Sequence, residues 1–230
     1  MRTRLFLSVI AATFVVALLV AASDVTGAAT SNLIDDKFNS KDLTTIEEHS
    51  PKTDTVGEGW SVEAGDWQVH KGKATENKGP DWFPSLDRRA LIDSGSTDID
   101  AEVQFKFSKT NRQFWGVVVR YTNSDNWIMA FHDGQGDLIL GKKVSDEDEV
   151  GNPLPGYVGF QEMGRVTNGW DNGTKKIRVE TQGTSIKVFH NNKLQIEAID
   201  EDHQTSSVVG IFSRGDGNGE FKKFTVKPNG

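Results

Sequence analysis

Three carboxylates stand at alternate positions in the segment TDIDAEVQFKF, residues 97–107: Asp98, Asp100 and Glu102. Two carboxyl groups about 5–5.5 Å apart can cleave a glycosidic bond with retention of configuration, one as the nucleophile and one as the acid and base. Along an extended strand, residues 98 and 102 are ~13 Å apart, and an aspartate closes that gap less well than a glutamate. Acids at every second position also form the solvated side of an ordinary strand, and we favour this second interpretation.

A second group depends on which side of each strand faces the core. If the apolar residues of VQFKF and GVVVRY point inward, Glu102, Gln104 and Arg120 point outward. His132 joins them if the next strand, NWIMAFHD, keeps the register. An arginine beside an acid, an amide and an imidazole offers the donors and acceptors that sugar hydroxyls require. The alternative is a cross-strand ion pair between Arg120 and Glu102, with no ligand.

Trp82 is a third candidate for ligand binding. It lies in NKGPDWFPSLDRR, which the flanking prolines indicate is a loop. A large aromatic side chain on a loop packs against the protein or binds something. The sequence predicts Trp82 as a ligand contact, with local packing as the alternative.

Short alternating strands separated by Gly, Asn and Asp account for most of the chain after residue 33. KKIRVETQGTSIKVFHNNKLQIEAID predicts three strands joined by turns at Gln182–Gly183 and Asn191–Asn192, residues that accept positive φ. No window shows the apolar spacing of an amphipathic helix. We therefore predict an all-β fold, a two-sheet antiparallel β-sandwich of the jelly-roll kind.

The N-terminal segment predicts export. Residues 1–23 begin with two arginines and continue into an apolar run, which is typical of a signal peptide, with an uncleaved anchor as the alternative. Residues 24–32 are then a linker and residues 33–230 one domain. The chain has 230 residues, no cysteine and a net charge of −7. This predicts a secreted or surface protein that is held together by its core and does not bind nucleic acid or anionic membrane.

The order of the segments LIDDKFNSKDL, GWSVEAGDWQVHKGKAT, DIDAEVQFKF, GVVVRYTNSDNWIMAF and VGIFSRGDGNGEFKKFTV resembles that of concanavalin A-like, laminin-G-like jelly-roll domains. The layout is also similar to the 3-keto-disaccharide hydrolase domain, in which the position of Arg120 is associated with the ligand. The resemblance implies that ligands lie on a concave sheet or on the loops at its rim. Laminarinase-like hydrolases of this fold carry E-x-D-x-E, so Asp98 stands at the position of their nucleophile.

The same resemblance implies a structural calcium ion where the two ends of the domain meet. Asp36 begins the first strand, and Asp216 and Glu220 flank the start of the last. Carboxylate oxygens are the ligands that Ca²⁺ prefers. The lysines of FKKF stand where relatives often place an acid, which counts against the site. Calcium at Asp36, Asp216 and Glu220 is thus an expectation from the resemblance.

Taken together, the sequence predicts a secreted or cell-surface domain that binds carbohydrate or glycoprotein without catalysis. The predicted ligand residues are Glu102, Gln104, Arg120, His132 and Trp82. One alternative is a glycan-active hydrolase or lyase of the keto-disaccharide hydrolase type that uses Arg120, Glu102 and His132. Another is a self-associating subunit of a surface layer, fibre or shell. Contact with a membrane is expected only through residues 1–23, if they are retained.

Overall fold

The computed structural model describes residues 31–77, 88–107, 114–133, 136–143, 160–167, 173–215 and 220–230. These residues form 17 β-strands and no helix, which confirms the predicted all-β class. Within this described part of the chain, no helix is long and apolar enough to cross a membrane. The predicted leader and most of the predicted linker lie outside the described residues and stay predictions.

The larger sheet contains ten antiparallel strands: β1 (Ile34–Asp36), β2 (Thr44–Thr45), β3 (Thr53–Asp54), β5 (Trp67–Val69), β6 (Ala74–Glu76), β8 (Ile99–Phe107), β13 (Gly173–Gln182), β14 (Ser185–His190), β15 (Lys193–Ile199) and β17 (Glu220–Pro228). Eight of them follow the spatial order β15–β14–β13–β8–β17–β6–β5–β2. β1 pairs with β17, and β3 pairs with β1. The first and last described strands therefore lie side by side.

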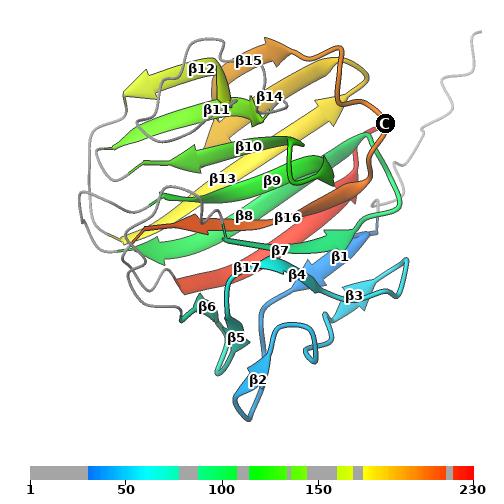
Figure 1. The fold of residues 1–230 in the computed structure, drawn as a ribbon, viewed down its shortest axis with the longest axis vertical. Helices are drawn as coiled ribbons and strands as arrows, with labels where there is room; N and C mark the ends of the chain where they lie inside the picture. Colours follow the sequence, from blue (N-terminus) through cyan, green and yellow to red (C-terminus); the bar gives the residue numbers. More distant parts are fainter. Residues whose placement is uncertain are drawn as a thin grey trace, which may run out of the picture.

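The smaller sheet contains seven antiparallel strands: β4 (Ser61–Ala64), β7 (Arg88–Asp93), β9 (Phe114–Asn123), β10 (Asn126–His132), β11 (Asp137–Lys143), β12 (Phe160–Thr167) and β16 (Val208–Arg214). Their order is β12–β11–β10–β9–β16–β7–β4. Figure 1 shows the two sheets stacked as layers, with the edge strands β12 and β15 together at one end. This arrangement confirms the predicted two-sheet sandwich.

The core lies between the sheets because each strand alternates in polarity. The inward residues of β8 are Ile99, Ala101, Val103 and Phe105, which are all buried in the central apolar cluster. β9 contributes Val117 and Val119 from the opposite layer. Complete burial of a valine, isoleucine or phenylalanine side chain stabilises the folded state by about 1.5–3 kcal/mol. The predicted turns are also present, since Gly183, Asn191 and Asn192 all have positive φ.

The outer sides of the two sheets differ in character. The seven-stranded sheet carries a second buried apolar cluster on its outer side, formed by Leu91, Val118, Tyr121, Trp127, Met129, Phe131, Ile139, Phe160 and Phe212. The ten-stranded sheet carries charged and polar side chains on its outer side between the inward apolar residues. Within the described residues, the outer side of the ten-stranded sheet therefore offers hydrogen-bonding groups on β8, β13, β14 and β17.

Candidate functional site

The outward side chains of four neighbouring strands, β8, β13, β14 and β17, form what we call the charged face. They are Asp100, Glu102, Gln104, Lys176, Arg178, Glu180, Lys187, Phe189, Lys223, Thr225 and Lys227. In register, Glu102 on β8 lies between Arg178 on β13 and Thr225 on β17. Strand pairing therefore brings together residues that are up to 127 positions apart in the sequence, from Asp100 to Lys227.

A depression of about 180 Å³ lies on the charged face. It is lined by Asn32, Asp100, Glu102, Arg178, Lys223, Thr225 and Lys227. Arg178 Nη1 donates to Asp100 Oδ2 over 3.1 Å and contacts Glu180 as well. The Arg178 guanidinium also lies over the Phe189 ring, with Cζ 3.7 Å from the ring centroid, in a cation–π contact. These contacts hold the planar guanidinium in one orientation at the side of the depression.

A smaller depression of about 70 Å³ lies beside the first. It is lined by Glu180, Gln182, Ser185, Lys187 and Asn229. The ion pair between Arg178 and Glu180 joins the two, because Arg178 lines the larger depression and Glu180 lines the smaller. The charged face thus offers two adjacent hollows whose lining groups both donate and accept hydrogen bonds.

The electrostatics of the larger depression depend on Asp100. Burial raises the pKa of Asp100 above its usual value, and nearby Glu180 adds to this effect. Arg178 acts in the opposite direction but does not outweigh burial. The second carboxylate oxygen, Oδ1, is enclosed and accepts no hydrogen bond within the described part of the chain. The ionised form of Asp100 is therefore only partly compensated by its surroundings.

The three alternating carboxylates at and just before the start of β8 each have a partner in the fold. Asp98 Oδ1 accepts a hydrogen bond from the backbone N–H of Gly183 over 2.8 Å. Asp100 pairs with Arg178, and Glu102 pairs with Lys176 at 3.2 Å. These partners belong to β13 or to the turn after it. The contacts favour the solvated-side interpretation of this strand over a catalytic pair.

The predicted group of Glu102, Gln104, Arg120 and His132 does not form. Glu102 and Gln104 lie on the charged face, and only Glu102 lines the larger depression. Arg120 and His132 belong to β9 and β10 in the other sheet. The predicted juxtaposition was wrong because it treated β8 and β9 as neighbours, whereas the chain changes sheets between them. Trp82 lies outside the described residues, so its role stays a prediction.

Arg120 is a buried link between the sheets. It has a positive φ of 54° where the pairing of β9 with β10 shifts register, and it is 1% exposed. Its Nη2 donates to the carbonyl of Gly183 in the opposite sheet over 2.5 Å. Burial lowers the pKa of Arg120, against the attraction of Asp200 and Asp98. The alternative, an ion pair between Arg120 and Glu102, is not formed either, because Arg120 lies between the sheets whereas Glu102 lies on the outer side of the ten-stranded sheet.

His132 faces the core and is 4% exposed. Ile128 on the same strand lies opposite Val119, and directly opposite residues share one side of a sheet. The even-numbered residues of β10 therefore point inward, contrary to the prediction. The His132 ring instead meets the ring of His190 on β14, with a centroid separation of 4.6 Å in an edge-on arrangement.

The described carboxylates of the expected calcium site do not fit that ion. Asp36 is 1% exposed, and its oxygens already accept hydrogen bonds from the Phe38 N–H, the His49 ring and the Trp60 indole. Asp36 lies opposite Phe224, four residues along β17 from Glu220, so the two carboxylates are not adjacent. Asp216 lies outside the described residues. A calcium ion at Asp36 would have to displace these hydrogen-bond donors.

Glu220 has cationic partners of its own. Lys73 Nζ is 2.6 Å from Oε1, and Lys222 Nζ is 2.8 Å from Oε2. Hydrogen bonds from Lys222 and then from Lys73 lower the pKa of Glu220 to about 2. Both oxygens therefore face ammonium groups, which is the opposite of the environment that a metal ligand requires.

A different trio, Asp200, Asp202 and His203, has ligand atoms within 4.8 Å of one another. The ammonium of Lys142 lies 3.2 Å from Asp200 and 2.6 Å from Asp202, where a metal ion would be held. Burial lowers the pKa of Lys142, but its hydrogen bonds to Asp202 and Asp200 outweigh burial and raise it. This cluster is thus an ion-paired link between β11 and the segment after β15.

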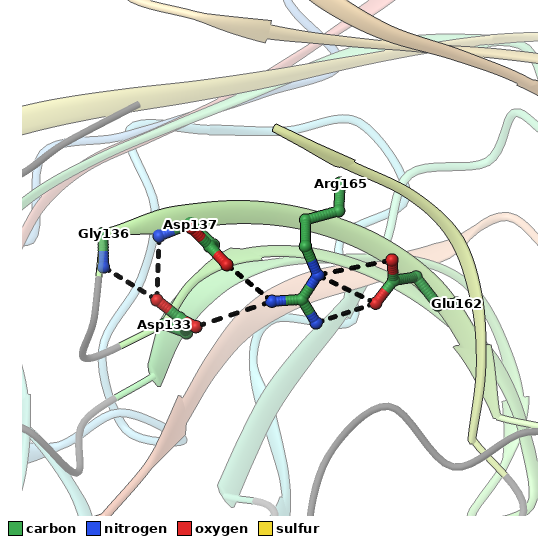
Figure 2. Close-up of polar contacts among 5 residues, drawn as sticks. All are labelled: Asp133, Gly136, Asp137, Glu162 and Arg165. Atoms are coloured by element: carbon green, nitrogen blue, oxygen red, sulfur yellow. Dashed lines mark hydrogen bonds and ion pairs between the residues drawn. The ribbon is translucent and has the colours of Figure 1, made fainter. Parts of the chain in front are cut away.

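The outer side of the seven-stranded sheet has a polar cluster around Arg165, drawn in Figure 2. Arg165 Nη1 donates to Asp137 over 2.6 Å, and Nη2 donates to Glu162 over 2.7 Å. Asp133 accepts from the N–H groups of Gly136 and Asp137 and lies 3.9 Å from Arg165. Hydrogen bonds to Glu162 and Asp137 raise the pKa of Arg165. The cluster stabilises the β10–β11 connection and the edge strand β12.

Sequence reasoning missed Arg178, Lys223, Thr225 and Lys227, which line the larger depression with Glu102. Each lies at an outward position of an alternating strand, in KKIRVET or FKKFTVK. The alternation could have identified these residues as exposed. It could not have shown that β13 and β17 flank β8, because strand order is set by the tertiary fold.

No protein-family model matches the chain, and no curated protein sequence does. Among solved structures, the carbohydrate-binding module CBM66 from Bacillus subtilis aligns with a TM-score of 0.55 and 15% identity, over 73% of this chain and 94% of that chain. The laminarinase from Rhodothermus marinus aligns with a TM-score of 0.57 and 11% identity, over 86% of this chain and 97% of that chain.

A third similar structure is the GH43 protein BlXynB from Bacillus licheniformis. It aligns with a TM-score of 0.56 and 14% identity over 83% of this chain, but this chain matches 40% of that longer protein. At such identities the likeness concerns the fold. The two stacked antiparallel sheets and these similarities lead to one conclusion: the chain has a concanavalin A-like jelly-roll fold.

Proposed function

We propose that this protein binds carbohydrate without catalysis, through the charged face, and acts outside the cytosol. The observation that carries the proposal is the pair of joined depressions lined by carboxylate, guanidinium, ammonium, hydroxyl and amide groups. Sugar hydroxyls are donors and acceptors at once, so a sugar site needs both kinds of partner at fixed positions. Two hollows side by side suit consecutive units of a sugar chain.

Preorganised side chains support binding at this face. Arg178 is held by Asp100, Glu180 and the Phe189 ring, so little side-chain freedom remains to be lost when a ligand arrives. The similarity to the module CBM66 adds support, since that protein is a carbohydrate-binding module on the same fold. The enzymatic alternative is weakened because Glu102 lies in the ten-stranded sheet, whereas Arg120 and His132 lie in the seven-stranded sheet.

A glycan-array screen of the chain followed by titration calorimetry tests the proposal. We expect Arg178→Ala to weaken binding of the best glycan by about tenfold or more, because the variant loses a partly buried, hydrogen-bonded charge that borders both depressions. The matched control is Arg165→Ala, which removes another arginine paired with two carboxylates but on the opposite sheet. The control should bind like the original chain, and a chelator should not change either result.

Two results would contradict the proposal. One is a correctly folded chain that binds no glycan on a broad array. The other is loss of binding in Arg165→Ala with full binding in Arg178→Ala, which would assign recognition to the seven-stranded sheet. Circular dichroism and thermal unfolding of both variants separate loss of binding from loss of fold.

A further inference from the structure

Two lysines of the larger depression, Lys223 and Lys227, differ from its other charged residues in that they form no ion pair within the described part of the chain. Glu102 pairs with Lys176 at 3.2 Å, and Asp100 pairs with Arg178 at 3.1 Å. Lys223 and Lys227 also line the depression, yet neither forms an ion pair or a side-chain hydrogen bond within the described part of the chain. Burial raises the pKa of Asp100, and Lys227, which lies opposite it, lowers that pKa in part by Coulombic attraction. The lining side chains carry three positive and two negative charges, so the depression is positive overall in a chain whose net charge is −7.

Strand register arranges the outward residues in and beside the depression in two adjacent rows, one on β17 and one on β8. On β17, Lys223, Thr225 and Lys227 point outward at alternate positions. They lie opposite Gln104, Glu102 and Asp100 on β8, respectively. One row therefore supplies ammonium groups around a hydroxyl, and the other supplies carboxylates and an amide. The rows are adjacent strands, so a ligand of one ring can contact both.

From this arrangement we infer that the larger depression recognises an anionic saccharide, with its acidic group against Lys223 and Lys227 and its hydroxyls against the β8 row. This inference rests on the proposed carbohydrate-binding function and specifies its ligand class. A hexuronate unit fits the two rows, because it has a carboxylate at one edge of the ring and hydroxyls at the other. The Lys223 and Lys227 Cα atoms are ~13 Å apart along the strand, a span that two flexible lysine side chains can close from both ends.

The β8 row also restricts the ligand. Asp100 and Glu102 repel a molecule that is negatively charged on every side, such as a nucleic acid or a densely phosphorylated peptide. The same two carboxylates accept hydrogen bonds from hydroxyl groups, which are more closely spaced on a sugar ring than on such polyanions. An acidic group on one edge and hydroxyls on the other satisfy both rows at once.

The test is calorimetric titration of the chain with an oligogalacturonate, with its methyl ester and with a neutral oligosaccharide of equal length. We expect the oligogalacturonate to bind about tenfold more tightly than its ester at low salt, with an affinity that falls as salt increases. A sulfated oligosaccharide forms a fourth arm. If the sulfated ligand binds more tightly than the uronate, the acidic group is a sulfate. That result also supports the inference that the ligand is an anionic saccharide.

The decisive variant is Lys223→Gln with Lys227→Gln. It should lose the preference for the acidic ligand, by about tenfold, and keep the affinity for the ester. The control is Lys106→Gln with Lys193→Gln, which changes the net charge equally at exposed positions outside the depression. The control should retain the preference, since a general change of charge acts weakly at a distance in salt.

The failure of this inference is distinguishable from that of the proposed function. Equal binding of acid, ester and neutral ligand, still lost in Arg178→Ala, overturns the anionic preference and leaves the binding function in place. An equal loss of preference in the two double variants also overturns it, because net charge alone would then explain the effect. Absence of binding in all four arms, by a folded chain, overturns both.

Discussion

Single residues at the start of β17 show how local charge sets the response to pH. Glu220 lies between Lys73 and Lys222, and its pKa is lowered to about 2 from 4.5. A carboxylate with a lowered pKa stabilises the folded state while it is ionised. Its contribution is therefore complete above pH 4.5 and is lost as the pH falls toward 2.

Glu220→Gln should lower the free energy of unfolding at pH 7 by about 0.5 kcal/mol, a small effect because the pair is partly exposed. The difference from the original chain should shrink to zero near pH 2, where the carboxylate becomes protonated. Urea unfolding at a series of pH values measures both. The control is Glu197→Gln, whose side chain is 59% exposed and pairs with Lys187 at 3.6 Å. A pH-independent difference for Glu220→Gln would show that charge is not the cause.

At the scale of the strands, close packing between β9 and β10 depends on a residue without a side chain. Gly116 lies opposite Phe131, and a Cβ atom placed on it would be 2.0 Å from the carbonyl oxygen of Ala130. That oxygen belongs to the backbone of a paired strand, so it cannot move without breaking the sheet. The sequence FWGVVVRY shows a glycine in a strand but not what it packs against.

Gly116→Ala should therefore lower the free energy of unfolding by about 3 kcal/mol, because the two strands must separate to admit one methyl group. Thermal and denaturant unfolding measure the loss. Gly183→Ala is the comparison: no atom lies within 4 Å of its would-be Cβ, and only its positive φ of 52° is unfavourable for alanine. That variant should cost about 1 kcal/mol. Equal effects at the two positions would exclude the steric explanation.

For the whole molecule, the stability of the sandwich depends on contacts between its two layers as well as within them. Arg120 reaches from β9 to the Gly183 carbonyl of the ten-stranded sheet and is almost fully buried. The same turn binds Asp98 through the Gly183 N–H. Gly183, in the turn between β13 and β14, thus links the residue that precedes β8 to β9 of the other sheet. A change at Arg120 should act on the assembly of the layers and not on a ligand.

Arg120→Ala should lower the free energy of unfolding by about 3 kcal/mol, because it leaves a cavity and an unpaired carbonyl between the sheets. Once folded, the variant should bind glycans with the affinity of the original chain, since Arg120 does not line either depression. Denaturant unfolding and calorimetry on the same sample separate the two properties. A stable variant that no longer binds would place Arg120 at the ligand after all.

The sequence alone determined the all-β class, the alternation that separates core from surface, and turns such as Asn191–Asn192. These features are local, because a period of two and a residue that accepts positive φ leave their mark within a few positions. The segment order was also enough to indicate a jelly roll. Glu102 and Gln104 were correctly placed on an outer side for the same reason.

Only the tertiary structure decided which strands are neighbours. The strand order in turn decided which residues come together in the candidate site. The chain changes sheets between β8 and β9, so Arg120 and His132 are separated from Glu102, although they are close in sequence. β13 and β17 instead flank β8 and bring Arg178, Lys223 and Lys227 to it. Such pairing depends on long-range packing of whole sheets, which no short stretch of sequence encodes.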